Sequence, residues 1–333
     1  WAPIAGKSLP SRAFAAWWLT FTGFWRALFT RGPLLALSSP PTLGLVLWVL
    51  SWLGRKGIYV LHDLHPDLGL ALGRLRPGFA ASLLRFIQRR NLARAKVVAI
   101  TQGMAENARR LQPRARPQVI ENWVDCTAIA PKPKAESALA RAQALAQPFV
   151  LQYSGNLGLL HPLDGLVRAM ADLPDCVLAF IGRGARLEAT RAAAAGLPNV
   201  RFLDYVPLAE LGDSLAACDV AVVALEPGAD RLAMPSKLVG ILAAGRPVLA
   251  LAPEGSELAQ LVLQANCGLA ADAADPAAIA AAVRRLRDDP ALRESFSRNA
   301  RSLAETRFSL TGAAEAYAAL LAEVSGNKVS TSP

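Results

Sequence analysis

The chain has 333 residues, enough for two ordinary domains. Apolar residues make up 53% of it and charged residues 19%, a composition that excludes an intrinsically disordered protein. Its four cysteines form no Cys-x-x-Cys pair, which excludes a disulfide framework and a zinc site and indicates reduced thiols in the cytoplasm.

Positive charge is concentrated in the first half of the chain. Residues 1–146 carry 20 Lys or Arg against 6 Asp or Glu, a net charge of +14, whereas residues 147–333 carry 16 against 20, a net charge of −4. A basic half predicts contact with nucleic acid or with anionic lipid. Tryptophans that lie beside arginines in strongly apolar stretches favour the membrane interface and argue against nucleic acid. These tryptophans are Trp17, Trp18, Trp25, Trp48 and Trp52.

Two apolar stretches near the start, 13–29 and 34–53, are candidates for membrane helices. Polar residues, or prolines and serines, interrupt both, whereas a spanning helix needs about 20 nearly uninterrupted apolar residues. We therefore expect a helix that lies in the membrane interface or is buried. The chain opens without Met and without a signal-peptide pattern, so we expect that residue 1 is not the natural start.

Short apolar strands alternate with helices in the first half, which predicts a parallel sheet with helices on its faces. The predicted elements are helix 11–30, strand 34–38, helix 42–53, strand 57–62, helix 79–94, strand 96–101, helix 103–111 and strand 117–121. Residues 127–147 are rich in Ala, Pro, Lys and Gln and are predicted to be a linker.

The second half alternates more clearly and predicts a complete doubly wound domain, whose ligand site lies at the carboxyl ends of the strands. Its predicted strands are 149–154, 177–181, 200–203, 220–225, 247–251 and 267–270. Its predicted helices are 162–172, 185–195, 208–217, 235–244, 255–265 and 276–288, and a last helix, 310–325, has room to cross back to the first half.

Two glycine-containing turns follow strands in this domain. They are Gly155-Asn156-Leu157-Gly158 and Gly182-Arg183-Gly184. Glycine lets a backbone approach a phosphate, whose oxygens then accept from amides of the turn, and Arg183 is a candidate for a diphosphate or a base edge. The alternative is an ordinary tight turn with a solvent-facing arginine.

The segment Met234-Pro235-Ser236-Lys237 is the strongest local signal. Proline suits the first turn of a helix, so free amides, the positive helix end and the Lys237 ammonium are expected to converge on one anion. A capped helix with a surface lysine is the alternative. Ser256 and Glu257 open a further helix, where Glu257 is a candidate for ribose or sugar hydroxyls and Ser256 is equally well explained as an N-cap.

In the first half, His62-Asp63-Leu64-His65-Pro66-Asp67 follows a predicted strand. Two of the three histidines of the chain lie here among carboxylates, which favours acid–base chemistry. The third, His161, follows the Gly155 turn. The cluster lacks recognisable metal-ligand spacing, so we expect no metal site.

Five motifs in this order resemble the family-4 glycosyltransferases of bacterial surface-polysaccharide pathways. They are Ser38-Ser39-Pro40-Pro41, Asp63-Leu64-His65-Pro66-Asp67, Glu121-Asn122-Trp123-Val124-Asp125, Tyr153 to Gly158 with Gly182-Arg183-Gly184, and Pro235-Ser236-Lys237-Leu238 through Gly245-Arg246-Pro247-Val248. The resemblance implies the GT-B fold: two facing Rossmann-like doubly wound domains, here with an incomplete N-terminal one. It divides the chain into an acceptor domain, 1–126, a linker, 127–147, a nucleotide-sugar-binding domain, 148–308, and a helix with tail, 309–333.

The resemblance also implies sugar transfer with retention of configuration, without an obligatory metal or other cofactor. Asp63 and His65 become the catalytic candidates. The donor diphosphate is assigned to Gly155, Asn156, Leu157, Gly158, Arg183, Ser236 and Lys237. The nucleotide and sugar are assigned to Gly182, Gly184, Met234, Pro235 and Glu257, with further contacts expected between Glu226 and Met234.

The chain departs from this family in two respects. Many members carry two glutamates around the helix that follows the Pro-Ser-Lys segment, and those places hold Leu232 and Gly240 here. Family members also open with a strand, a glycine loop and a helix, and about seventy residues precede the point where this chain begins.

The interpretation is a glycosyltransferase that uses a nucleotide-sugar donor and a lipid-linked or saccharide acceptor. It is expected to be cytoplasmic and peripheral on the inner face of the plasma membrane, bound to anionic lipid through its first half and not to nucleic acid. The alternatives are a catalytically impaired GT-B partner protein, a nucleotide-sugar epimerase and a dinucleotide-binding oxidoreductase. The absence of a Gly-x-Gly-x-x-Gly motif at the start of the second half disfavours the last.

Overall fold

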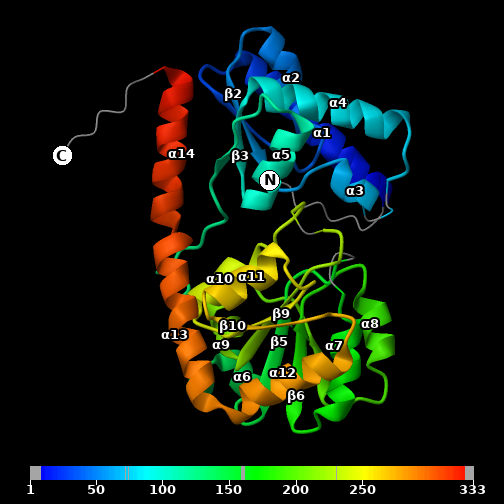
Figure 1. Ribbon diagram of the computed structural model, residues 1–333, viewed down its shortest axis with the longest axis vertical. Helices are drawn as coiled ribbons and strands as arrows, with labels where there is room; N and C mark the ends of the chain where they lie inside the picture. The colour runs from blue at the N-terminus through cyan, green and yellow to red at the C-terminus, as the bar shows by residue number, and fades with distance from the viewer. Residues whose placement is uncertain (1–8, 72, 74, 159–161, 230, 327–333) are drawn as a thin grey trace, which may run out of the picture. The chain divides into compact units, whose positions relative to one another are not determined.

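A computed structural model describes residues 9–71, 73, 75–158, 162–229 and 231–326. The chain forms two compact units, each an α/β structure with an entirely parallel sheet (Figure 1). The first unit comprises Trp1–Glu121, Arg231–Met234 and Ala314–Pro333, and the second comprises Asn122–Asp230 and Pro235–Ala313.

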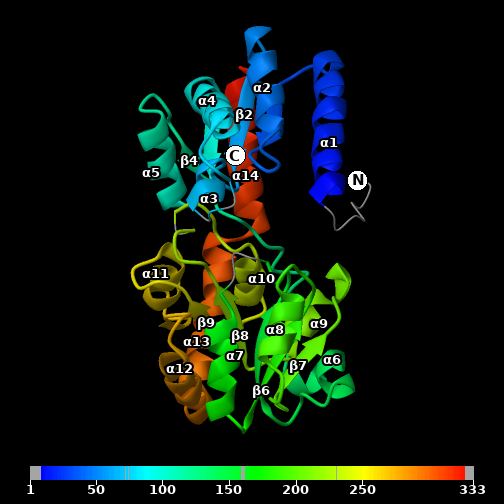
Figure 2. The ribbon, with the colours of Figure 1, turned by 90° about the vertical axis from the view of Figure 1, so that its right-hand side faces the viewer.

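The first unit contains a four-stranded sheet in the order β1-β2-β3-β4. Its elements are α1 (Leu9–Phe29), β1 (Leu34–Leu37), α2 (Leu43–Trp52), β2 (Gly57–Leu61), α3 (Asp67–Ala71), α4 (Phe79–Arg94), β3 (Lys96–Ala99), α5 (Gln102–Leu111) and β4 (Gln118–Val119). Every residue of β2 is buried, as the uninterrupted apolar run Ile58-Tyr59-Val60-Leu61 predicts for a central parallel strand. Helices α1, α2 and α4 lie side by side in this unit (Figure 2).

The second unit contains a six-stranded sheet in the order β10-β9-β8-β5-β6-β7. Its strands are β5 (Phe149–Ser154), β6 (Cys176–Ile181), β7 (Val200–Leu203), β8 (Val220–Ala224), β9 (Val248–Leu251) and β10 (Gly268–Ala271). Its helices are α6 (Ala138–Ala142), α7 (Asp164–Ala169), α8 (Leu187–Ala193), α9 (Leu211–Ala216), α10 (Lys237–Ala243), α11 (Glu257–Gln264), α12 (Pro276–Asp288) and α13 (Pro290–Arg307), and α14 (Leu310–Ser325) joins the first unit from Ala314 onward.

Strand β5 marks the point where the strand order of this sheet reverses. The chain adds β6 and β7 on one side of β5, and then β8, β9 and β10 on the other. In open doubly wound sheets, ligands bind beyond the carboxyl ends of the strands at such a point. A ligand site is therefore expected at the loops that follow β5, β6 and β8.

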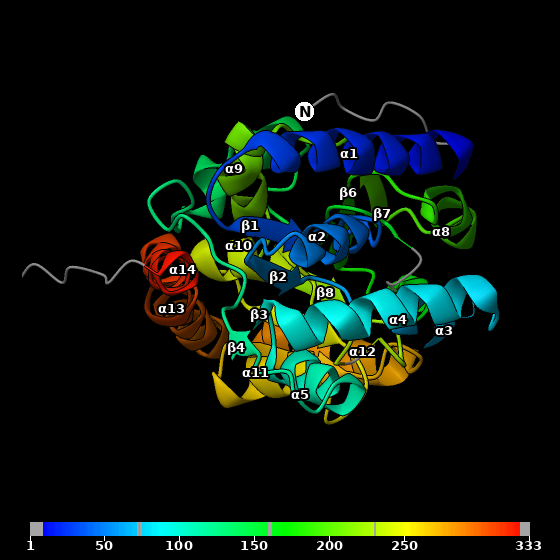
Figure 3. The ribbon, with the colours of Figure 1, turned by 90° about the horizontal axis from the view of Figure 1, so that it is seen from above.

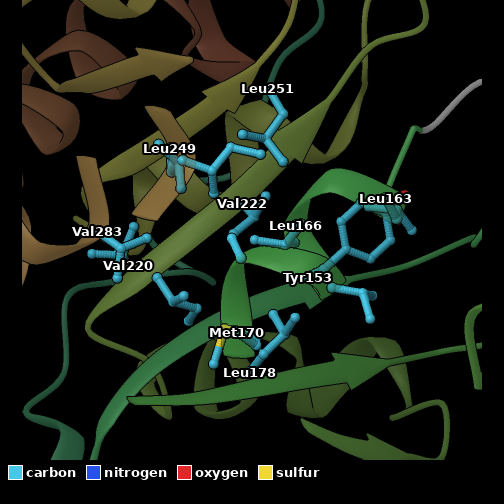
Figure 4. Close-up of a cluster of buried hydrophobic side chains, with 14 of the residues drawn as sticks. Tyr153, Leu163, Leu166, Met170, Leu178, Val220, Val222, Leu249, Leu251 and Val283 are labelled. Carbon is cyan, nitrogen blue, oxygen red and sulfur yellow. The ribbon is translucent and has the colours of Figure 1, made fainter. Parts of the chain in front are cut away.

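An apolar core lies against one face of the six-stranded sheet. Alternate residues of β5 point into it, and α7 and α12 cover it with residues such as Leu166 and Val283 (Figure 4). Tyr153 is fully buried at the carboxyl end of β5, where it lies beside Leu163 (Figure 4). The end of β5 is thus fixed by packing on the core.

The segment expected as a linker, 127–147, belongs to the second unit and contains α6. Asp213 at the start of α9 accepts hydrogen bonds from the Ala138 and Leu139 amides, at 3.1 and 3.0 Å, and pairs with Lys132 at 2.5 Å. Burial alone would raise the pKa of Asp213, but its hydrogen bonds hold that pKa at about 2. One partly buried carboxylate thus makes several contacts that order this proline-containing sequence.

Several helices differ from the sequence-based elements. Helix α10 begins at Lys237, so the prediction that Pro235 occupies the first turn of a helix is wrong: Pro235 and Ser236 precede it. Helices α3 and α13 were not predicted, because α3 is short and α13 is highly charged, with an apolar period limited to Phe296, Ala300 and Ala304. Among the described residues, no helix has the length and apolar character needed to cross a membrane.

Candidate functional site

The two glycine turns of the second unit pack backbone against backbone. The Leu157 amide donates to the Arg183 carbonyl at 2.9 Å, and the Gly155 amide donates to the Ile181 carbonyl at 2.8 Å. Gly155 and Gly182 have φ of +114° and +137°. A Cβ on Gly182 would lie 2.1 Å from the Gly155 carbonyl oxygen, and one on Gly184 would lie 2.3 Å from that of Leu157. Glycine is therefore required for this contact, which joins the ends of β5 and β6.

Lys237 extends toward these turns. Its Nζ lies 3.5 Å from the centroid of the Tyr153 ring and 3.6 Å from the place a Cβ would occupy on Gly155. The Nζ atom is buried and has no hydrogen-bond partner among the residues that the structure describes. Burial lowers the pKa of Lys237 from 10.5 to about 7. An ammonium in this position has a ring face beneath it and no counter-charge, so it favours an anion.

Tyr153 connects the lysine to the turn. Its hydroxyl donates to the Asn156 carbonyl at 2.9 Å, while its ring face supports the ammonium. Burial raises the pKa of Tyr153, so the hydroxyl keeps its proton. Tyr153, which lies within a strand predicted from the sequence, therefore contacts both the cation and the turn.

A partly buried glutamate, Glu226, follows β8, the strand beside β5. Oε2 of Glu226 is buried and accepts no hydrogen bond within the described part of the chain. The sequence indicated only that contacts would fall between Glu226 and Met234, and it did not single this carboxylate out. Among the described residues, a carboxylate oxygen and an ammonium without hydrogen-bond partners thus both follow β8, which is paired with β5 at the reversal point of the sheet.

The other predicted donor-site residues differ in their exposure to solvent. Arg183 is 67% exposed and lies 3.2 Å from Asp204, and Asn156 and Ser236 are exposed. Ser236 makes no side-chain cap to α10, whereas Ser256 accepts from the Ala259 amide at 3.3 Å and therefore caps α11. The remaining predicted residues are buried or partly buried, namely Leu157, Gly158, Gly184, Met234, Pro235 and Glu257. His161 lies outside the described residues.

The predicted catalytic residues lie together in the first unit, on the loop after β2. His65 Nε2 lies 4.0 Å from Asp63 Oδ2. Ser38 fixes this loop, because its hydroxyl donates to the Asp63 carbonyl at 2.8 Å and accepts from the amides of His62 and Asp63. Burial lowers the pKa of His65, and the Asp63 charge opposes that effect.

A short segment of the loop after β8 is part of this first unit. The Leu64 amide donates to the Leu232 carbonyl at 3.2 Å, and Leu232 and Met234 pack against the apolar core of the unit. Glutamates were expected at positions 232 and 240. Leu232 packs against the apolar core of the first unit and Gly240 is buried within α10, so both positions lie in apolar surroundings. No cluster of three or more His, Cys, Asp or Glu suited to a metal occurs in the described ranges.

The second unit matches a known family. Residues 148–289 fit the family model described as Glycosyl transferases group 1. This segment of the second unit is thus similar to the group 1 glycosyl transferases. The probable glycosyltransferase WbjE of Pseudomonas aeruginosa is 29% identical over 235 residues, which cover 68% of this chain and 59% of WbjE. The lipopolysaccharide core biosynthesis glycosyltransferase LpsD of Rhizobium meliloti is 30% identical over 224 residues, covering 66% of this chain and 62% of LpsD.

Solved structures show the fold of the whole chain. The HepE protein of Anabaena, solved in complex with UDP and glucose, superposes with a TM-score of 0.75 over 92% of this chain and 80% of HepE, at 19% identity. Sucrose-phosphate synthase of Thermosynechococcus elongatus gives a TM-score of 0.73 over 95% of this chain and 78% of that protein, at 21% identity. The predicted GT-B fold is confirmed. The chain matches about 60% of the length of its first two curated relatives.

Proposed function

We propose that this chain transfers a sugar from a nucleotide-diphosphate sugar to a lipid-linked or saccharide acceptor, with retention of anomeric configuration and without an obligatory metal. The observation that carries the proposal is the buried, unpaired Lys237 ammonium against Tyr153, beside a glycine turn at the reversal point of the sheet. A diphosphate supplies the counter-charge that this ammonium lacks.

The chemistry requires stabilisation of a leaving group. The bond between the sugar C1 and the diphosphate oxygen breaks, a bond forms between C1 and the acceptor oxygen, and the acceptor proton moves to the departing diphosphate. Negative charge therefore grows on the diphosphate in the transition state, where a fixed ammonium in a dry site acts most strongly. Because the Gly155 and Leu157 amides already donate to protein carbonyls, Lys237 supplies most of this stabilisation, with Arg183 and Ser236 at the exposed rim.

Glu226 takes the part of the glutamates that are absent at positions 232 and 240. Its buried oxygen Oε2 is suited to accept a hydrogen bond from a ribose or sugar hydroxyl, and Glu257 offers a second carboxylate in the first turn of α11. Asp63 and His65 act on the acceptor side. At 4.0 Å from Asp63, His65 is placed to exchange a proton through a neighbouring carboxylate or a water.

The comparisons supply the first donor to test and the setting. HepE has been solved with UDP-glucose and with UDP, so uridine diphosphate sugars come first. LpsD is named for lipopolysaccharide core biosynthesis, which supports a surface-saccharide acceptor at the inner face of the plasma membrane. We place the chain there as a peripheral protein of the cytoplasmic side.

A thermal-shift screen of nucleoside diphosphates and their sugars tests the donor site. At least one diphosphate should raise the Tm of the chain, because a ligand that binds only the folded state stabilises it. Lys237→Ala should lose most of that shift, whereas Arg298→Ala, which removes an exposed cation of the same unit, should keep it. The proposal fails if no nucleotide raises the Tm, or if Lys237→Ala responds like the wild-type chain.

A further inference from the structure

Helix α1 carries a continuous stripe of exposed aromatic side chains. Its six members recur at i, i+3, i+4, i+7, i+11 and i+15, which places them on one face of the helix. They are Phe14, Trp17, Trp18, Phe21, Trp25 and Phe29, with exposed fractions between 44% and 78%. The rings contact one another along the helix: Trp17 stacks on Phe21 at 5.4 Å, and Trp25 stacks on Phe29 at 6.2 Å.

The opposite face of α1 packs on the protein. Thr20 Oγ1 donates to Thr42 Oγ1 at 2.7 Å, next to the start of α2, and Arg55 Nη1 donates to the Ala27 carbonyl at 2.9 Å. Small residues line this face at helical spacing, so α1 approaches α2 closely. They are Ala16, Thr20, Gly23 and Ala27. The aromatic stripe therefore faces away from α2, and α1 lies at the margin of the row α1, α2 and α4 (Figure 3).

The surroundings of the stripe are exclusively basic in sequence. Residues 1–62 contain six Lys or Arg and no Asp or Glu. Arg26, Arg31 and Lys56 are exposed at or near the end of α1. An exposed aromatic stripe beside several cations and no anions is complementary to an anionic, partly apolar surface.

A second group of rings and cations lies on the neighbouring helices. Trp52 of α2 is 64% exposed, with the Arg94 guanidinium 4.6 Å from its ring centroid. The exposed Phe86 of α4 carries the Arg90 guanidinium at 4.9 Å. Arginine held on an aromatic ring keeps its charge at the level of that ring, as lipid phosphates beside inserted side chains require.

A bilayer-spanning arrangement does not suit α1. Arg26, Thr20 and Thr22 interrupt its apolar character, and no described helix is apolar enough to span. One-sided apolarity suits a helix that lies parallel to the bilayer, with its rings at the boundary between headgroups and acyl chains.

We infer that α1 is an in-plane membrane anchor, which docks the chain on the anionic phospholipid leaflet through this aromatic stripe, with Arg26, Arg31 and Lys56 at the lipid phosphates. The inference names the helix that binds the membrane in the proposed function, and it rests on the part of that proposal that places the chain at an anionic membrane. It does not depend on sugar transfer, so vesicle binding and the nucleotide-induced Tm shift can fail separately.

Flotation of the full chain with vesicles tests the anchor. Vesicles of phosphatidylcholine with about one third phosphatidylglycerol should bind it, and pure phosphatidylcholine vesicles should bind it at least about tenfold more weakly. Lipids brominated near the headgroup end of the acyl chains should quench its tryptophan fluorescence. Trp17→Ser with Trp18→Ser and Trp25→Ser should weaken binding at least about tenfold. The control replaces three large apolar residues of the second unit that are each more than half exposed, namely Tyr205→Ser with Leu208→Ser and Leu263→Ser.

Charge reversal tests the lipid phosphates. Arg26→Glu with Arg31→Glu and Lys56→Glu should abolish the preference for anionic vesicles. Reversal of Arg109, Arg110 and Arg114 to Glu changes the net charge equally at exposed positions around α5 and should keep it. A circular dichroism spectrum and a Tm without ligand that match those of the wild-type chain show that each variant is folded.

Three results would overturn the inference. The first is equal binding of the tryptophan variant and the wild-type chain, and the second is equal loss in both charge-reversal variants. The third is self-association through the stripe, seen as a dimer that binds no vesicles and dissociates when the tryptophans are replaced.

Discussion

At the scale of single residues, the site depends on a lysine that the folded protein holds in an unfavourable state. Burial disfavours the charged form of Lys237, and the Tyr153 ring compensates only in part. In the unliganded chain, the pKa of Lys237 is about 7 in the folded state and 10.5 in the unfolded state. The free energy of unfolding should therefore fall as pH decreases from about 10.5 to about 7. Below about pH 7 the loss is complete, because the folded chain then holds the lysine in its charged form. The charged form of Lys237, which binds the diphosphate, therefore lowers the stability of the folded chain.

The affinity for a nucleotide-diphosphate sugar should consequently depend on pH. A diphosphate diester binds the charged lysine, so above pH 7 the chain must take up a proton on binding, and affinity should fall by about tenfold per pH unit. Below pH 7 the affinity should be nearly constant, because the lysine is already charged. Calorimetry with UDP-glucose in two buffers of different ionisation enthalpy measures the proton uptake directly.

Lys237→Met provides the control for this titration. It should bind weakly at every pH, take up no proton and, without ligand, unfold at a higher temperature than the wild-type chain at pH 6. A wild-type affinity that is flat between pH 7 and pH 9 would show that Lys237 does not titrate against the diphosphate.

The residues of the site differ in how far the sequence could predict them. Gly155, Gly182 and Lys237 follow strands or precede a helix in recognisable patterns, and local sequence carries that information. The contact between Lys237 and Tyr153 joins residues that are 84 positions apart, so it arises only from packing. Glu226 was not identified as an unpaired carboxylate, because burial of a single side chain atom leaves no trace in the sequence.

At the scale of elements, helix α10 is held in place from its far end. Arg301 of α13 donates to the Ala243 carbonyl at the end of α10 at 2.7 Å. The same guanidinium donates to the Cys126 and Ile129 carbonyls at 2.9 and 2.8 Å. One arginine therefore ties α10, which begins with Lys237, to the segment before α6.

Arg301→Met should lower the free energy of unfolding by about 2–4 kcal/mol, because three carbonyls lose a charged donor at once. Arg298→Met is the matched control. Both arginines pair with a glutamate four positions away at 2.7 Å, but the Arg298 side chain is 66% exposed against 22% for Arg301. Its loss should change stability by less than about 0.5 kcal/mol. Urea unfolding compares the two, and equal destabilisation would mean that the three carbonyl contacts contribute nothing.

The sequence predicted the buried strands better than it predicted helix α13, which carries the Arg301 contacts. β2 and β8 are short, uninterrupted apolar runs, and β5 is apolar except at Gln152 and Ser154. Helix α13 consists mostly of polar and charged residues, and Arg301 makes its contacts to distant carbonyls. Polar contacts of this kind have no periodicity, so the helix was overlooked.

At the scale of the whole molecule, charge and chemistry are separated along the chain. The net charge is +14 over residues 1–146 and −4 over residues 147–333. The lipid contact proposed for α1 involves exposed cations, whereas the diphosphate contact proposed for Lys237 involves a buried one. Salt screens exposed charges much more strongly than buried ones.

Salt should therefore separate the two activities of one chain. Raising NaCl from about 100 mM to about 1 M shortens the screening length from about 10 Å to about 3 Å, so binding to anionic vesicles should weaken by at least about tenfold. The Tm shift caused by a nucleotide diphosphate should change far less over the same range. The variant with Arg26, Arg31 and Lys56 changed to Glu should show little salt dependence in its residual vesicle binding. Vesicle binding that ignores salt in the wild-type chain would leave the aromatic stripe as the sole attraction, and the basic residues would then have no part in docking.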